Sequence, residues 1–386
     1  MSAPKRFETA EAQLHETATA ATGLDNFGSP DYLNGLRVML AAFDESSNRP
    51  EPAREFCWGT LVGCLMGRLH AVQGWREHPE CLQRPVMRPL IITGIPRTGT
   101  TALHKLLSED PQFQGLEMWL TQYPMARPPR GTWETHPAYR TMVANLNAFY
   151  EAVPQMRAMH NMVAGEVDEC LEVLKHSFTS NRFGSTFHLP AYDKWWMDQD
   201  EKAAYKYYAD VVRLIGAHSP DKRWLLKNPG HVWKLEALLD VFPDACIVQT
   251  HRDPAKAIPS VCSTMAAARP LGDGVSTEPH LLGRRESTLW SEAMRRTAVV
   301  RKRSPSHFFD VDHRDFHADP LGTVRLIYNR FGLTLAPVTE VRMQARIEAN
   351  PEASHGAHHY TLEHYGLTRE SVHDMFHDYI ELYDLV

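Results

Sequence analysis

Residues 89–107 read PLIITGIPRTGTTALHKLL, and this stretch carries the strongest structural signal in the chain. Positions 90–92 form a short apolar run typical of a buried strand, whereas the apolar residues at positions 102, 103, 106 and 107 follow the spacing of a helix. Between them, Gly94 and Gly99 permit backbone conformations and close approaches that a side chain would prevent. The stretch therefore predicts a strand, a glycine-containing loop and a helix whose first backbone amides bind an anion.

The loop also contains side chains that bind negative charge. Arg97 supplies a positive charge with planar donors, and Thr100 and Thr101 supply hydroxyl groups. The spacing is similar to the NTPase pattern G-x-x-x-x-G-K-[ST], in which the lysine reaches the terminal phosphates of ATP or GTP. Here Thr100 follows Gly99 in place of that lysine. The sequence therefore disfavours an ordinary NTPase.

Two more segments have a strand followed by polar residues and a helix. Residues 245–250 are strand-like, and the HRDP sequence at 251–254 leads into a helix, because proline suits the first helical position. Arg252 then lies at the end of the strand, and Ser260 lies about two helical turns farther on. A third strand-like run, 308–312, is followed directly by His313.

These segments resemble the sulfotransferase superfamily. Its loop has the pattern P-[KR]-[ST]-G-T-T, which residues 96–101 match, and it holds the 5′-phosphosulfate of the co-substrate 3′-phosphoadenosine-5′-phosphosulfate (PAPS). The family also holds the 3′-phosphate with an arginine at a strand end and a serine eight residues later, the spacing of Arg252 and Ser260. The resemblance implies that PAPS contacts these residues: Arg97, Thr98, Gly99, Thr100, Thr101, Arg252, Ser260 and His313.

The contact implied for His313 depends on the third match. Residues 308–320 read FFDVDHRDFHADP and are similar to the family stretch Y-E-D-x-x-x-D-P, whose tyrosine contacts adenine. His313 stands where that tyrosine would be, so its ring would take over the contact. The end of the match has a second interpretation, because Asp319 and Pro320 also form a typical helix start.

Sulfonate transfer needs cations beside the transferring group and a base for the proton of the acceptor. Lys227 ends a strand-like run at 223–227 and resembles a family lysine, in K-x-P or K-x-x-x-P contexts, that contacts the transferring group. We therefore predict catalytic roles for Lys227 and Arg97. The predicted chemistry requires no metal ion.

The base is harder to assign. Cytosolic small-molecule sulfotransferases use a histidine two residues after the lysine, but that position here is Pro229. Tyrosylprotein sulfotransferases and some bacterial carbohydrate sulfotransferases use a glutamate some twenty residues beyond the loop, and Glu117 occupies that region. Glu117 is therefore the leading candidate, with Glu166, Glu169 and His231 as alternatives.

Composition limits the partners of the chain. Its 386 residues are 43% hydrophobic and 23% charged, with a formal charge of −6, which suits one large or two modest domains with a full core. The acidic balance, without a block of lysine or arginine, excludes nucleic acid as the expected partner. No apolar run of about 18 residues and no signal-peptide core appear, so we expect no transmembrane segment and a cytoplasmic location. The six cysteines lack metal-site spacing and are expected to be reduced and buried.

The strand signals predict the organisation of the chain. Strand-like runs at 90–94, 223–227, 245–250 and 307–312, separated by helical stretches, predict an α/β fold with a P-loop-type parallel sheet flanked by helices. We expect residues 1–88 to form a helical N-terminal region and, as the resemblance implies, residues 89–386 to form the sulfotransferase α/β domain. A helical insert at about 118–220 would lie on the acceptor side. At 355–360 the sequence HGAHHY occupies the region where family members often fold a loop over the nucleotide.

The resemblance does not identify the acceptor, which could be a hydroxyl or amine of a small molecule, a lipid or a glycan. Two other functions remain open. A P-loop kinase of a small metabolite would share the fold but would use ATP and Mg²⁺. A nucleotide-binding protein of the same fold would bind without turnover.

Overall fold

A computed structural model of the chain describes residues 3–45, 49–349 and 360–386. At its centre is a parallel sheet of five strands in the order β2-β3-β1-β4-β5. The strands are β1 (Leu90–Gly94), β2 (Phe113–Gln114), β3 (Arg223–Lys227), β4 (Cys246–His251) and β5 (Phe308–Asp312). The predicted parallel sheet flanked by helices is confirmed. The two-residue β2 was not predicted, because it is too short to produce a periodic signal.

Helices make up most of the remaining chain. Before the sheet come α1 (Glu11–Thr22), α2 (Leu33–Glu45), α3 (Glu51–Glu77) and the short turns η1 (Pro30–Tyr32) and η2 (Pro79–Gln83). Between β1 and β3 lie α4 (Thr100–Leu107), α5 (Met118–Gln122), η3 (Arg130–Thr135), α6 (Pro137–Ala152), α7 (Met156–Met159), α8 (Leu171–Leu174), η4 (Lys175–Ser177), α9 (Asn181–Thr186), α10 (Pro190–Met197) and α11 (Lys202–Ile215). Between β3 and β5 lie η5 (Pro229–Trp233), α12 (Leu235–Val241), α13 (Pro254–Ala268), α14 (Pro270–Asp273), α15 (Pro279–Arg303) and η6 (Pro305–His307). After β5 come α16 (His313–Ala318), α17 (Pro320–Phe331), α18 (Pro337–Ala349), η7 (Glu363–Tyr365), α19 (Arg369–Met375) and α20 (His377–Tyr383).

The sheet is buried on both faces, which explains the unbroken apolar run of β1. Leu90 and Ile92 pack in the cluster that contains side chains of α4 and α17, whereas Ile91 packs with side chains of α11 and α12. Successive strand residues point to opposite faces, so a strand covered on both faces needs apolar residues at every position. All five β1 residues are buried.

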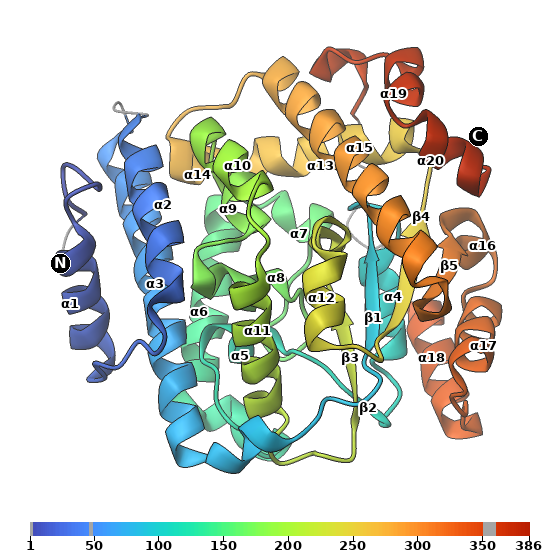
Figure 1. The fold of residues 1–386 in the computed structure, drawn as a ribbon, viewed down its shortest axis with the longest axis horizontal. Coiled ribbons are helices and arrows are strands. Elements are labelled where there is room, and N and C mark those ends of the chain that lie inside the picture. Colours follow the sequence, from blue (N-terminus) through green and yellow to red (C-terminus); the bar gives the residue numbers. More distant parts are fainter. Residues whose placement is uncertain (1–2, 46–48, 350–359) are drawn as a thin grey trace.

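The N-terminal helices share a core with the helices that follow β4. Leu61 and Leu65 of α3 belong to the same buried cluster as Ile258 of α13 and Trp290 of α15. In Figure 1, α1–α3 lie at one end of the molecule and α16–α18 at the other, with the sheet between them. Residues 3–45 and 49–88 contain helices and no strand.

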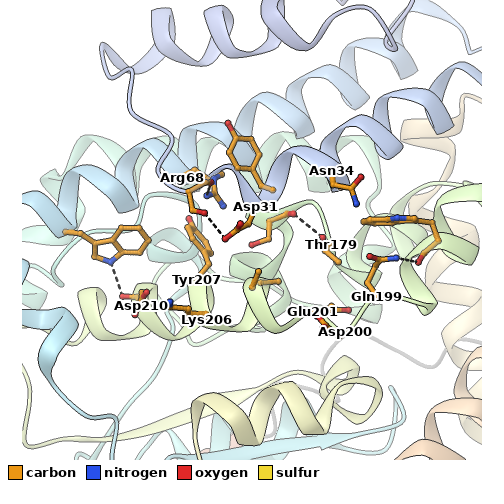
Figure 2. Close-up of a pocket in the computed structure, with 18 residues that line it drawn as sticks. Asp31, Asn34, Arg68, Thr179, Gln199, Asp200, Glu201, Lys206, Tyr207 and Asp210 are labelled. Atoms are coloured by element: carbon orange, nitrogen blue, oxygen red, sulfur yellow. Dashed lines mark hydrogen bonds between the residues drawn. The ribbon is translucent and has the colours of Figure 1, made fainter.

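A buried arginine ties α3 to the segments around it. Arg68 lies over the rings of Tyr32 and Tyr207, with its guanidinium carbon 4.1 and 4.6 Å from the ring centroids. Its donors reach the carbonyl oxygens of Phe27 and Ser29, at 3.2 and 3.0 Å. Arg68, Tyr207 and Glu201 line a cavity of about 290 Å³. Figure 2 shows Arg68 and Tyr207 close together, with Glu201 farther along the cavity. Because the arginine is stacked and hydrogen-bonded, it stabilises the contact between α3, η1 and α11.

Two further features can be checked in the described ranges. None of the helices there is long and apolar enough to span a membrane. All six cysteines lie in those ranges, and each is buried and free, as predicted.

Candidate active site

The carboxyl ends of the parallel strands bring the predicted site residues to one edge of the sheet. β1 lies between β3 and β4, with Ile92 paired to Lys227 and Gly94 paired to Thr250. Arg252 immediately follows β4, and His313 immediately follows β5. Ligands of open parallel sheets bind at this edge, because the loops that follow the strands converge there.

The loop after β1 has the backbone shape that its glycines permit. Gly94, Arg97 and Gly99 have φ values of 141°, 70° and 96°. A β-carbon on Gly94 would lie 2.5 Å from the carbonyl oxygen of Thr250, so this position requires glycine. The left-handed Gly99 then caps α4, which begins at Thr100, so unpaired amides face the loop.

Thr98 stabilises the loop through hydrogen bonds of its side chain. Its hydroxyl donates to the carbonyl oxygen of Ile95 at 2.7 Å and lies 2.5 Å from the hydroxyl of Thr250. The side chain is buried, with 1% of the residue exposed. The Thr98 hydroxyl therefore holds the loop against β4, whereas the residue's backbone amide is the group left for a ligand.

Arg97, Arg252 and Ser260 meet beside the loop. The Arg97 Nε donates to the Ser260 hydroxyl at 3.1 Å, and a guanidinium nitrogen of Arg252 donates to the carbonyl oxygen of Arg97 at 2.9 Å. Arg97 also donates to the carbonyl oxygen of Met159 at 2.9 Å. Residues predicted from separate segments thus form one group with two positive charges, which is suited to a ligand with more than one phosphate.

His313 lies next to the same loop. A β-carbon on Gly99 would be 3.5 Å from its ring. Burial, with smaller contributions from Arg252 and His317, lowers the pKa of His313 to about 4. The imidazole is therefore neutral at neutral pH and can present an uncharged ring face.

A cavity of about 280 Å³ adjoins Arg252 and His313. Its wall includes further cations that our sequence analysis did not select. It is lined by Arg252, Asp253, Lys256, Asp312, His313, Arg314, Arg369, Leu385 and Val386. Arg369 comes from α19, far along the chain, so only the fold could place it here.

A second cavity, of about 210 Å³, opens on the other side of the loop after β1, which we call the phosphate-binding loop from its predicted role. Arg97, Thr100 and Thr101 line it together with Asp168 and Glu169. The remaining wall residues come mainly from the helical insert, α13 and the segment after β3. We call this space the reaction cavity.

A buried ion pair lies at the wall of the reaction cavity. The Lys227 Nζ is 2.6 Å from a carboxylate oxygen of Glu169 and 3.4 Å from the Thr101 hydroxyl. The Cys170 amide donates to the carbonyl oxygen of Lys227 at 2.8 Å, so the end of β3 positions the backbone beside Glu169. Burial raises the pKa of Glu169, whereas the Lys227 ammonium and His160 lower it. The lowering effects are together the larger, so the pKa of Glu169 is below its ordinary value. Glu169 is therefore a carboxylate at neutral pH.

The adjacent acid behaves differently. Burial raises the pKa of Asp168, whereas burial lowers the pKa of His160, and the two side chains interact electrostatically. Asp168 accepts a hydrogen bond from the Glu169 amide at 2.6 Å. Asp168 thus supports the backbone that presents Glu169.

The structure does not bring Glu117 to this group. Glu117 pairs with Arg127 at 3.0 Å, and its backbone forms an isolated bridge with Val167. Arg127 also donates to the side chain of Gln114 at 2.9 Å and to the carbonyl oxygen of Gly115. Glu117 is not among the described residues that line the reaction cavity, and its ion pair anchors the insert near β2.

The other two alternatives are also engaged elsewhere. Glu166 pairs with Lys105 at 2.7 Å. His231 is fully buried, 2.8 Å from the Tyr205 hydroxyl, and burial lowers its pKa to about 3. Of the four carboxylate and histidine candidates, Glu169 is the one that lines the reaction cavity beside Lys227.

The nucleotide-covering loop proposed at 355–360 falls almost wholly on residues 355–359, which lie outside the described part of the chain. Tyr360 is described and contributes to the electrostatic environment of Arg97.

Two solved structures are similar to nearly the whole chain. Sulfotransferase STF1 from Mycobacterium tuberculosis H37Rv has 37% sequence identity and a TM-score of 0.85, with coverage of 96% of this chain and 99% of that one. Sulfotransferase STF9 from Mycobacterium avium has 27% identity and a TM-score of 0.88, with 97% of each chain covered.

Comparison of sequences gives the same family. The curated omega-hydroxy-beta-dihydromenaquinone-9 sulfotransferase Stf3 of Mycobacterium bovis, and its counterpart in Mycobacterium tuberculosis, are 25% identical to this chain over 266 residues. That match covers 64% of this chain and 63% of the relatives, so it spans less than two thirds of their length. The model of the sulfotransferase family matches residues 89–337, from the start of β1 to the start of α18. The chain therefore belongs to the sulfotransferase family.

Proposed function

We propose that the protein transfers the sulfonate group of PAPS to a hydroxyl group of an acceptor. The observation that carries the proposal is the contact of Arg97, Arg252 and Ser260 beside the phosphate-binding loop. A donor with both a 5′-phosphosulfate and a 3′-phosphate needs two neighbouring anion sites, and these contacts bring the residues for both together. The loop would hold the first, and Arg252 with Ser260 would hold the second.

The remaining nucleotide contacts follow from this placement. The amides of Gly99, Thr100 and Thr101 would bind the 5′ group at the start of α4. The neutral ring of His313 would lie against the adenine. The residues present thus fit an adenine nucleotide with two separate anionic groups.

The residues of the reaction cavity would carry the transfer. When bound, PAPS supplies an electrophilic sulfur and a phosphate leaving group. Glu169 would accept the proton of the acceptor hydroxyl while the hydroxyl oxygen forms a bond to sulfur. Lys227 would balance the negative charge that develops on the phosphate oxygen as the bond between that oxygen and sulfur breaks. The product nucleotide would be 3′-phosphoadenosine-5′-phosphate (PAP). Glu169 replaces Glu117 as the proposed base, because Glu169 pairs with Lys227 and lines the reaction cavity together with Thr101.

The chelator test separates this function from a kinase. We expect transfer of ³⁵S from labelled PAPS to an acceptor to continue in EDTA, because Arg97 and Lys227 supply the positive charge that ATP-dependent transfer takes from Mg²⁺. The measurement is the rate of product formation with EDTA and with added Mg²⁺, using both PAPS and γ-labelled ATP. Transfer from ATP that stops on chelation would favour the kinase. Binding of PAP without transfer to any acceptor would favour a non-catalytic nucleotide-binding protein.

A second prediction concerns the 3′-phosphate. We expect Arg252→Ala to reduce the preference for PAP over AMP by about 10- to 100-fold, the loss of a hydrogen bond to a charged group worth ~1.5–3 kcal/mol. Calorimetric titration with the two nucleotides measures this preference. Arg284→Ala, at an exposed position of α15, is the matched control and should keep it. Equal affinity of the unaltered protein for PAP and AMP would contradict the assignment.

A further inference from the structure

A larger cavity adjoins the reaction cavity on the side of α3. Its volume is about 530 Å³, within the ~300–1,000 Å³ of pockets that bury organic ligands. The two cavities share the wall residues Phe56, Phe149, Met162, Glu172, Arg182 and Thr186. An acceptor whose hydroxyl reaches Glu169 can therefore extend into the larger space, which we call the tail cavity.

Most side chains around the tail cavity are apolar. They come from α3 on one side and from α5 and α6 on the other. The apolar group consists of Phe56, Val62, Met66, Met118, Met142, Leu146, Phe149, Met162 and Phe183. Four of these are methionines, whose flexible side chains adapt to irregular apolar ligands. The lining suits a hydrocarbon better than a sugar or another polar group.

One face of α3 leaves room for the ligand. Gly59 and Gly63 lie one helical turn apart and both line the tail cavity. A β-carbon at either position would meet no described atom within 4 Å. Glycine disfavours a helix interior, and packing does not require it at these two positions.

Two other glycines of the same helix give a contrast. A β-carbon on Gly67 would lie 2.4 Å from the ring of His176, and one on Gly74 would lie 2.5 Å from Leu214. At those positions close packing requires glycine. At Gly59 and Gly63 the absence of a side chain instead widens the tail cavity.

The wall that the two cavities share contains charged side chains that pair with each other or with neighbouring residues. Glu172 lies 2.6 Å from the Lys175 ammonium and 2.8 Å from the Arg182 guanidinium, and it accepts a hydrogen bond from Gln122 at 3.0 Å. Because the carboxylate is satisfied by these three donors, it does not demand a polar partner from the ligand. The aliphatic stem of Arg182 can line the path of an apolar chain.

We infer that the acceptor is an alcohol whose hydroxyl is at the end of an extended apolar chain, that the tail cavity holds this chain, and that Gly59 and Gly63 set its permitted length. The inference rests on the proposed function, because it takes the space beside Glu169 as the site of transfer. It adds the chemical class of the acceptor and the residues that select it.

The experiment uses 1-butanol, 1-hexanol, 1-octanol and 1-decanol as probes of the full chain with PAP bound. Calorimetry should show the dissociation constant falling about fourfold for each added methylene, the fold-change that corresponds to ~0.8 kcal/mol. Gly63→Leu should weaken the binding of 1-decanol at least tenfold and change the affinity for 1-butanol less than twofold. Asn145→Trp adds a large ring to the cavity wall from an exposed position of α6, so it should also weaken the binding of 1-decanol without disturbing the core.

Two control variants distinguish blocking of the tail cavity from destabilisation of the fold. Gly131→Leu, at an exposed glycine of η3 outside both cavities, should leave all four affinities unchanged. Gly63→Ala should raise the melting temperature, because alanine favours the helix.

The outcomes distinguish this inference from the proposed function. Affinities independent of chain length, or 1-decanol bound normally by both Gly63→Leu and Asn145→Trp, would overturn the inference. Transfer of sulfonate to 1-butanol and 1-decanol with equal kcat/KM would overturn it while leaving the proposed function intact. A protein that neither binds PAP nor transfers sulfonate from PAPS would overturn the proposed function itself.

Discussion

Glu169→Gln is expected to lower kcat by about 10² to 10⁴ while the affinity for PAP stays within a few-fold of the original value. Glutamine has nearly the same shape as glutamate but cannot accept the acceptor's proton as a carboxylate does. Because Glu169 faces Lys227 and does not belong to the Arg252 group, nucleotide binding and turnover should separate. Single-turnover transfer of ³⁵S from PAPS, with PAP titrations of the same samples, measures both.

Glu117→Gln is the matched comparison. The amide can still accept the hydrogen bond of Arg127, and the residue does not line the reaction cavity, so we expect kcat to stay within a few-fold of the original. A collapse of kcat in Glu117→Gln beside a normal Glu169→Gln would return the role of base to Glu117.

The pH profile gives an independent check on Glu169. Since its net pKa lies below the ordinary glutamate value, the base is ionised throughout the neutral range. We expect the acid limb of kcat/KM to be centred below the ordinary pKa of a glutamate. An acid limb near pH 6 to 7 that disappears in a histidine variant would instead assign the proton transfer to a histidine.

Lys227→Met is expected to damage both stability and turnover. Lys227 is 1% exposed, and its removal leaves the partly buried Glu169 carboxylate without its cation, which should cost about 3–5 kcal/mol at neutral pH. Turnover should fall by about 10² to 10³, because the charge on the departing phosphate loses its partner. Urea unfolding and kcat with PAPS measure the two effects.

The Lys227–Glu169 pair also predicts how the stability of Lys227→Met depends on pH. Without Lys227, burial, which raises the pKa of Glu169, outweighs the remaining lowering effect of His160, so the variant should regain stability as the pH falls and the carboxyl group takes up a proton. The double variant Lys227→Met with Glu169→Gln should recover most of the lost stability at neutral pH, because no buried charge remains, yet it should stay inactive. Unchanged stability of Lys227→Met would contradict the buried ion pair.

The local structure around the proposed nucleotide site could be predicted because each part of it is local in the sequence. The phosphate-binding loop is one strand, one turn and one helix, so glycine placement and the change of hydrophobic period identify it. Arg252 and Ser260 belong to a single strand-to-helix unit, and their spacing is set by helix geometry. The exact strand limits at 90–94 and 223–227 agree with the structure for the same reason.

The choice of base could not be predicted in this way. Glu117, Glu166 and Glu169 differ little as residues in a sequence, and they are distinguished by the cation that each one meets: Arg127, Lys105 and Lys227, respectively.

What the sequence by itself determined is the parallel sheet, the glycine-containing loop after its first strand and the placement of Arg252 and Ser260 on one strand-to-helix unit, because local periodicity and backbone preference specify them. Only the tertiary structure decided which carboxylate lies beside Lys227, that Arg369 lines the same cavity as Arg252, and that two glycines of α3 border a cavity that shares wall residues with the reaction cavity. The physical reason is that ion pairing, burial and cavity shape depend on segments far apart in the chain, whose positions are set by the packing of the whole core.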